Sequence, residues 1–246
     1  MMALEIAGLT KRFGAIEALT DVSLAIEAGE VVGLMGDNGA GKSTLVKMVA
    51  GNFPPSSGEI RLDGRVTHFH SPDDARIKGI EVVYQDLALC DNLTAAANVF
   101  LGREIKRRIA GINVLDHRAM NERAARLFAE LKSETRPRDV VRSMSGGQRQ
   151  AVAIARTRLS EPRIVLMDEP TAAISVRQVA EVLNLIRHLK EEGIAVVLIS
   201  HRMPDVFSVC DRLVVLRRGR KVADKRVSES SPEEATGLIT GAIETA

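Results

Sequence analysis

The chain has few cysteines, little net charge and no long hydrophobic run. Its two cysteines, Cys90 and Cys210, show no metal-ligand spacing, so we expect reduced thiols in a cytoplasmic protein. The net charge of +2 favours no strongly charged partner, and we interpret the basic residues at 103–108 as a solvated face, with no nucleic-acid partner. Every apolar run is too short to cross a bilayer, and the N-terminus lacks a signal-peptide pattern. Any membrane-spanning part is therefore expected in another chain.

Short apolar runs alternate with helical patterns, which is typical of an α/β fold. Residues 93–131 carry helical patterns and no strand signal, with Asp116 as a helix N-cap. We predict one domain over residues 1–246, with an α/β core and an antiparallel β edge from residues 1–90 and 160–246, and an inserted helical subdomain at about residues 91–159. Strands are expected at residues 4–9, 22–26, 31–35, 59–62, 80–84, 164–167, 194–199, 213–216 and 221–223. Helices are expected at residues 44–50, 72–78, 118–131, 149–158, 176–190 and from about 231 onward.

Residues 36–43 fit G-x-x-x-x-G-K-[ST], a loop that holds the phosphates of a nucleotide. Its glycines let backbone N–H groups turn inward, Lys42 reaches the β- and γ-phosphates, and the Ser43 hydroxyl is a Mg²⁺ ligand. Because the loop lies between a predicted strand and a predicted helix, the phosphates meet the positive end of a helix dipole. The sequence thus predicts a P-loop NTPase core. The predicted nucleotide ligands here are Gly36, Asp37, Asn38, Gly39, Ala40, Gly41, Lys42, Ser43 and Thr44.

Polar residues follow three further core strands. Gln85, the pair Asp168 and Glu169, and His201 come directly after apolar runs. Each has an ordinary interpretation when taken singly: a loop amide, turn residues before a proline, and a helix cap or surface residue. Together with the phosphate loop, these residues place groups that can bind phosphate, bind a metal and exchange protons at one edge of the sheet. Ligands of open α/β sheets bind at this edge, at the carboxyl ends of the strands.

Phosphoryl transfer to water requires a held nucleotide, neutralised charge and a positioned water. Asp168 fits a carboxylate on the Mg²⁺ side, and Glu169 is placed to polarise the attacking water as a general base. His201 is expected to contact the γ-phosphate and orient that water. The predicted catalytic residues are thus Glu169, His201 and Lys42, the predicted metal ligands are Ser43, Gln85 and Asp168, and the predicted cofactors are ATP and Mg²⁺.

Residues 144–148, Met-Ser-Gly-Gly-Gln, form a second predicted helix N-terminus, whose free backbone N–H groups suit an anion. It is redundant for one nucleotide site, but it makes sense if it covers the ATP of a partner subunit. With this motif the chain resembles the nucleotide-binding subunit of ABC transporters, and the resemblance covers nearly the whole chain with the motifs in the family's order. It implies that Phe13 stacks on adenine. It also implies that the signature residues Ser145, Gly146, Gly147 and Gln148 contact ATP.

The resemblance implies a head-to-tail dimer that sandwiches two ATP molecules with C2 symmetry. ATP binding closes this dimer, hydrolysis and product release open it, and a groove near Gln85 passes the motion to transmembrane permease subunits. The protein is then peripheral on the cytoplasmic face of the inner membrane.

Residues 36–43, 169–173 and 200–207 look most like the ATPases of bacterial simple-sugar importers for ribose, xylose or fructose. We therefore expect ATP-powered sugar import, with a periplasmic or extracellular sugar-binding protein as an indirect partner. Many such ATPases carry two fused halves, and we expect this chain to correspond to one half, without a C-terminal regulatory domain. The alternatives are another cargo, such as a branched-chain amino acid or an exported lipid, and a soluble ABC ATPase acting on DNA or ribosomes.

Two positions depart from the family pattern. Met144 replaces the usual leucine, which is a volume-conserving change. Ser175 stands where most of the family places an aspartate that reaches across the dimer toward the opposing phosphate loop. Ser175 still fits a helix N-cap, with Gln178 completing a capping box, but it supplies no charge.

Overall fold

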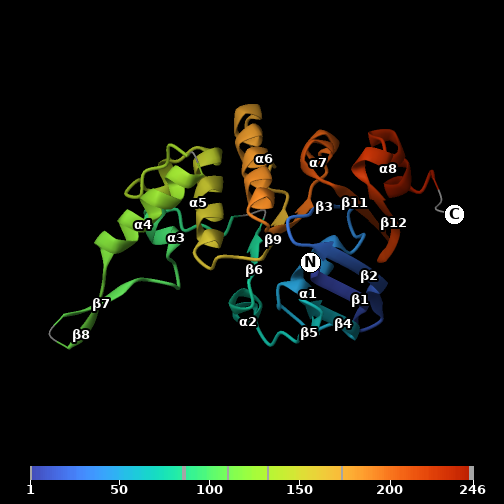
Figure 1. Ribbon diagram of the computed structural model, residues 1–246, viewed down its shortest axis with the longest axis horizontal. Coiled ribbons are helices and arrows are strands. Elements are labelled where there is room, and N and C mark those ends of the chain that lie inside the picture. The colour runs from blue at the N-terminus through green and yellow to red at the C-terminus, as the bar shows by residue number, and fades with distance from the viewer. Residues whose placement is uncertain (1, 85–86, 110, 132, 173, 244–246) are drawn as a thin grey trace.

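A computed structural model describes residues 2–84, 87–109, 111–131, 133–172 and 174–243. Its centre is a six-stranded sheet with the order β12-β11-β3-β10-β9-β6 (Figure 1). The pairs among β11, β3, β10, β9 and β6 are parallel, and β12 is antiparallel to β11. The bounds are β3 Val31–Met35, β6 Ile80–Val83, β9 Ile164–Asp168, β10 Ala195–Ile199, β11 Arg212–Arg217 and β12 Arg220–Arg226.

A four-stranded antiparallel sheet, in the order β2-β1-β4-β5, forms the predicted antiparallel edge. Its long strands continue beyond the predicted alternating runs. The bounds are β1 Met2–Phe13, β2 Ile16–Glu27, β4 Ser57–Leu62 and β5 Arg65–Val66. Helix α1 (Lys42–Val49) and the short helix α2 (Pro72–Ile77) lie on the same side of the central sheet (Figure 1).

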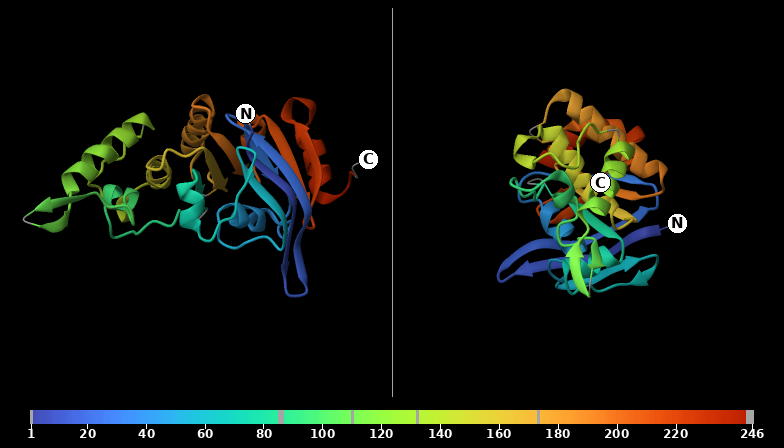
Figure 2. Two further views of the ribbon diagram at one scale, coloured as in Figure 1. Left: turned by 60° about the horizontal axis from the view of Figure 1, so that its bottom comes forward. Right: turned by 90° about the vertical axis from the view of Figure 1, so that its left-hand side faces the viewer.

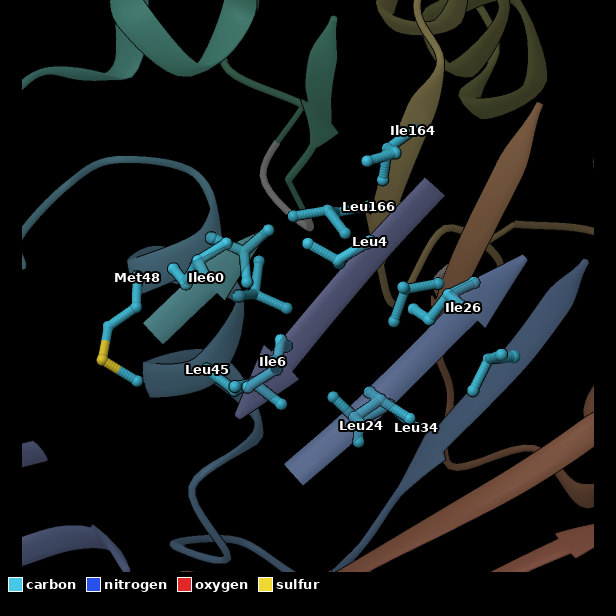
Figure 3. Close-up of a cluster of buried hydrophobic side chains, with 14 of the residues drawn as sticks. Leu4, Ile6, Leu24, Ile26, Leu34, Leu45, Met48, Ile60, Ile164 and Leu166 are labelled. Carbon is cyan, nitrogen blue, oxygen red and sulfur yellow. The ribbon is translucent and has the colours of Figure 1, made fainter. Parts of the chain in front are cut away.

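Alternate residues of the central strands face two different hydrophobic clusters. Val32 and Leu34 of β3 pack with α1 and the antiparallel sheet, whereas Val31 and Met35 pack on the opposite face. Figure 3 shows the first cluster, where Leu34 and Leu166 lie with side chains of β1, β2, β4 and α1. This period of two places both faces of the sheet in a core, so that its strands read as nearly continuous apolar runs.

Helices cover the second face of the central sheet (Figures 1 and 2). They are α6 Val176–Glu191, α7 Met203–Val209 and α8 Pro232–Thr240, with α5 Gly146–Arg158 at the sheet's end. The predicted caps Asp116 and Ser175 are confirmed, because each accepts a hydrogen bond from a backbone N–H three residues on, and Ser231 caps α8 in the same way. Short 3₁₀ turns occupy Val141–Ser143 and Val227–Glu229.

The segment between β6 and β9 projects to one end of the molecule (Figure 2). Helices α3 (Ala95–Val99), α4 (His117–Glu130) and α5 share a hydrophobic cluster of their own, which contains Phe100 and Phe128. The expectation that this segment lacks strands is wrong, since β7 (Lys106–Ile109) and β8 (Ile112–Leu115) form an antiparallel hairpin. Most side chains of the hairpin are exposed, so it has no buried face to produce the alternation by which strands are recognised.

Candidate nucleotide-binding site

The phosphate loop joins β3 to α1 in a conformation that requires glycine. Gly36 has φ +150°, and a Cβ there would lie 2.3 Å from the carbonyl oxygen of Leu216. Gly41 has φ +103°, and a Cβ there would lie 2.6 Å from Cδ2 of Leu19. Because both positions combine an unusual backbone with a close neighbour, the loop shape is specified at each end by the absence of a side chain.

Lys42 is buried and directed into its own loop. Its Nζ donates hydrogen bonds to the carbonyl oxygens of Gly36 at 2.7 Å and Asp37 at 3.0 Å. Burial lowers the pKa of Lys42, and the charges of Glu169 and Asp168 oppose that shift. Lys42 and the two carboxylates line the same pocket, where their charges act on one another.

One pocket of 410 Å³ unites most of the predicted site. It brings the phosphate loop together with residues at or just after the ends of β9 and β10, which lie more than a hundred residues further along the sequence. The lining residues are Ile16, Glu17, Ala18, Asn38, Gly39, Ala40, Gly41, Lys42, Ser43, Thr44, Asp168, Glu169, Ile199 and His201. Gly36 and Asp37 join the site through their contacts with Lys42, and Gln85 lies outside the described residues.

Glu169 is held in an uncommon backbone conformation. Its φ is +50°, in the left-handed region, and its N–H donates to the carbonyl of Ile199 on the neighbouring strand β10. The Oε1 atom of Glu169 is buried and accepts no hydrogen bond from the described residues, although His201 Nε2 lies 3.3 Å away. Backbone strain and a buried carboxylate oxygen that accepts no hydrogen bond from the described residues are characteristic of functional sites.

The two carboxyl groups have perturbed acidities. Burial raises the pKa of Asp168, and Lys42, Lys47 and His201 oppose this shift. Burial also raises the pKa of Glu169; a positively charged His201 opposes the shift, and the charge of Asp168 adds to it. Glu169 therefore has a more basic carboxylate than a solvated glutamate, which suits proton abstraction near neutral pH.

The oxygen donors in this pocket fit a magnesium ion. Among the described residues no group of three or more His, Cys, Asp or Glu side chains is arranged around one point. Mg²⁺ bound to a nucleotide needs only one or two protein oxygens, because phosphates and waters complete its shell. Ser43 and Asp168 line the same pocket and supply one hydroxyl and one carboxylate.

The signature residues lie in a different pocket, at the N-terminus of α5. Ser145 is the N-cap of this helix and forms a capping box with Gln148. The pocket measures 340 Å³ and is lined by Ser133, Glu134, Ser145, Gly147, Gln148, Ser175, Arg177, Gln178 and Glu181. It shares no lining residue with the phosphate-loop pocket. Within one chain, the phosphate loop and the signature residues therefore line different pockets.

Phe13 lies beside the phosphate-loop pocket and not in its lining. Its ring makes an edge-to-face contact with Phe53 at 5.4 Å, and Lys11 Nζ lies 5.1 Å from the Phe13 centroid. Ile16, which is 70% exposed, lines the pocket instead, together with Ala18. Sequence reasoning missed these β2 residues. The only sequence feature that points to them is the apolar residue Ile16 directly after the turn at Gly14 and Ala15.

The fold and this site define a P-loop nucleotide-binding protein of the α/β class. A family model described as "ABC transporter" matches residues 19–172, which is more than half of the chain. The chain belongs to the ABC transporter family, and it is an ABC-type ATPase. The predicted family and fold class are thus confirmed.

Curated relatives match nearly the whole chain. The xylose/arabinose import ATP-binding protein XylG of Sulfolobus acidocaldarius is 44% identical, over 96% of this chain and 93% of its own length. The fructose import ATP-binding protein FrcA of Rhizobium meliloti is 43% identical with the same two coverages. A ribose import ATP-binding protein, RbsA 2 of Rhizobium johnstonii, is 40% identical over 97% of this chain, which spans 46% of that relative.

Solved structures share the fold. A nucleotide-free ATP-binding cassette from an ABC transporter superposes with a TM-score of 0.82 at 25% identity, covering 98% of this chain and 96% of that one. A dimeric ATP-binding cassette in a post-hydrolysis state, bound to ADP and Pi, has a TM-score of 0.76 at 28% identity, and the match covers 91% of this chain and 98% of that one. These likenesses extend over the core and the projecting helical segment together.

Proposed function

We propose that this chain is the ATP-hydrolysing subunit that powers import of a simple sugar through a membrane permease. The relatives named above are import ATP-binding proteins for xylose or arabinose, fructose and ribose, and they favour a sugar over the alternative cargoes. The particular sugar is not specified by any residue of this site, because the subunit acts on ATP.

The observation that carries the dimeric mechanism is the separation of the two phosphate-binding elements. The signature N-terminus of α5 lines one pocket and the phosphate loop lines another, with no residue in common. Within one chain the signature has no nucleotide to contact. A second copy related by a two-fold axis places each signature over the phosphate loop of the other copy, so that each ATP is held by both subunits.

In the proposed site, each residue acts on one part of the reaction. Lys42 and the N–H groups of the phosphate loop hold the phosphates, and Glu169 takes a proton from the attacking water. His201 orients that water and contacts the γ-phosphate. Ser43 and Asp168 would hold Mg²⁺, which neutralises the charge on the phosphates when bound.

The proposed permease contact is a pocket between the core and the projecting helical segment. A pocket of 240 Å³ lies along β6 and is lined by residues 80–84, by α2 and by the projecting helical segment. Arg103 and Arg156 reach it from the helical segment, and Pro72 and Arg76 from α2. A permease helix seated there contacts both parts, so a movement between them is passed on to the permease.

No helix among the described residues is long and apolar enough to cross a bilayer. The proposed location is peripheral, at the cytoplasmic face of the inner membrane.

Purification from detergent-solubilised membranes tests this function. A tagged chain should bring down a permease, and the ATPase activity of that complex should rise when a sugar-loaded binding protein is added. The Lys42→Ala variant should co-purify equally well and show no stimulated activity. Recovery of the chain with ribosomes, nucleic acid or an amino-acid permease instead would contradict the proposal.

A further inference from the structure

The amide of Gln178 bridges the two segments that line the signature pocket. Its Oε1 accepts a hydrogen bond from the backbone N–H of Ser175 at 2.9 Å. Its Nε2 donates to the hydroxyl of Ser145 at 3.3 Å. The side chain thus joins the N-cap of α6 to the N-cap of α5, two positions separated by thirty residues.

The backbone fixes which way this amide points. A backbone N–H is only a donor, so the end of the Gln178 amide that faces Ser175 must be its oxygen. The NH₂ group must then face Ser145. Packing holds the side chain in place as well, because a Cβ on Gly147 would lie 2.6 Å from Cγ of Gln178.

The Ser145 hydroxyl oxygen consequently accepts two hydrogen bonds. One comes from Gln178 Nε2 and the other from the backbone N–H of Gln148, at 3.3 Å each. Within the part of the chain that the structure describes, this hydroxyl donates to no acceptor, and Ser145 is exposed. With both lone pairs engaged, its proton is left for a partner outside the chain. An anion is the group that such a directed O–H binds best.

We infer that Gln178 is a positioning residue that directs the proton of the Ser145 hydroxyl outward, toward a phosphate of the nucleotide held by a second copy of this chain. The inference rests on the proposed function, since the phosphate comes from the partner's site. It also gives the segment after Glu169 a direct connection to the signature: Ser175 orients Gln178, and Gln178 orients Ser145.

A double-mutant cycle tests this inference. Gln178→Met removes both hydrogen bonds and keeps the side-chain length. Loss of a directed bond to a charged group should lower the ATP turnover number by about tenfold. Affinity for a fluorescent ATP analogue in the monomer should not change, because Gln178 is not in the phosphate-loop pocket. In a Ser145→Ala background the same substitution should cost less than about twofold, since no hydroxyl remains to be directed.

The control is Asn184→Met. Asn184 is an exposed amide on the same helix that accepts a hydrogen bond from Arg187 at 2.7 Å, and its replacement should leave turnover unchanged. If Gln178→Met lowers turnover equally with and without the Ser145 hydroxyl, Gln178 serves only to cap α6 and the inference is overturned.

A second variant reverses the proton direction. Gln178→Glu keeps the acceptor for the Ser175 N–H but presents an acceptor to Ser145, which turns the hydroxyl proton inward. In a Glu169→Gln background, ATP-dependent dimerisation should weaken more with Gln178→Glu than with Gln178→Met at pH 8, and should recover as the new carboxyl is protonated at lower pH. Equal dimerisation of all three proteins would overturn the inference alone. If the Glu169→Gln parent never dimerises with ATP, the proposed function itself has failed.

Discussion

The Nε2 atom of His201 lies 3.3 Å from Oε1 of Glu169, although the two residues follow different strands. They meet because β10 and β9 are adjacent and parallel, so that their carboxyl ends reach the same edge. Burial raises the pKa of Glu169, and a positively charged His201 opposes that shift. The acidity of the proposed base therefore depends on its neighbour.

This relationship predicts the pH dependence of ATP hydrolysis. A general base must be ionised, so the turnover number should fall as pH decreases through the raised pKa of Glu169. His201→Ala removes the opposing positive charge, which should move the acid limb to higher pH and lower the turnover number by about a hundredfold. The measurement is the residual turnover from pH 5 to pH 9. An acid limb in the same place for both proteins would show that His201 does not influence the base.

The contact between Gly147 and Gln178 predicts an overpacking effect. Gly147→Ala places a methyl group against Cγ of Gln178, which should destabilise the protein by about 1–3 kcal/mol in urea unfolding. The same substitution in a Gln178→Ser background should cost less, because the shorter side chain leaves room. If the cost is equal in the two backgrounds, this contact is not why glycine occupies the position.

Substitution of Ser175 should separate its local role as a helix cap from an effect on the other subunit of the dimer. Ser175→Asp should keep the cap of α6, since Asp accepts the same backbone hydrogen bond, and the free energy of unfolding should change by less than about 1 kcal/mol. The new negative charge should alter the cooperativity of ATP hydrolysis across the dimer. Unchanged cooperativity and rate would remove the idea that the missing aspartate matters for communication between the sites.

An ion pair between buried Glu81 and partly buried Arg103 joins the core to the helical segment. Glu81 of β6 contacts Arg103 at 3.0 Å and accepts a hydrogen bond from the Ser160 hydroxyl at 2.5 Å. Glu81→Gln should destabilise the protein by about 3 kcal/mol, because the partly buried Arg103 loses its charged partner.

The matched control for this pair is Glu122→Gln. Glu122 pairs with Arg118 on the exposed surface of α4, and its loss should cost less than about 0.5 kcal/mol. Chemical unfolding measures both variants. Equally small decreases in the free energy of unfolding for the two variants would show that the Glu81–Arg103 pair does not hold the core and the helical segment together.

Much of the fold and site was predictable because strong local rules apply. The central strands are continuous apolar runs, and the caps at Asp116, Ser175 and Ser231 follow side-chain chemistry. Arg218 and Gly219 form the turn between β11 and β12. The phosphate loop is specified by its glycines. These features depend on a few neighbouring residues, which a sequence displays directly.

What the sequence did not reveal depends on contacts between distant segments. The bridge from Gln178 to Ser145 needs the relative placement of α5 and α6, and the lining by Ile16 needs the position of β2. The hairpin of β7 and β8 has mostly exposed side chains, so no buried face selects an alternating pattern. The left-handed conformation of Glu169 leaves no mark on residue type at all.

The most direct test of the account is the oligomeric state of Glu169→Gln with ATP. This variant should bind ATP but not hydrolyse it, so the closed dimer should accumulate. Size-exclusion chromatography with light scattering should give a dimer with ATP and a monomer with ADP, and Lys42→Ala in the same protein should abolish the ATP-dependent dimer. A monomer under every condition, with ATP shown to be bound, would contradict the shared site on which the account depends.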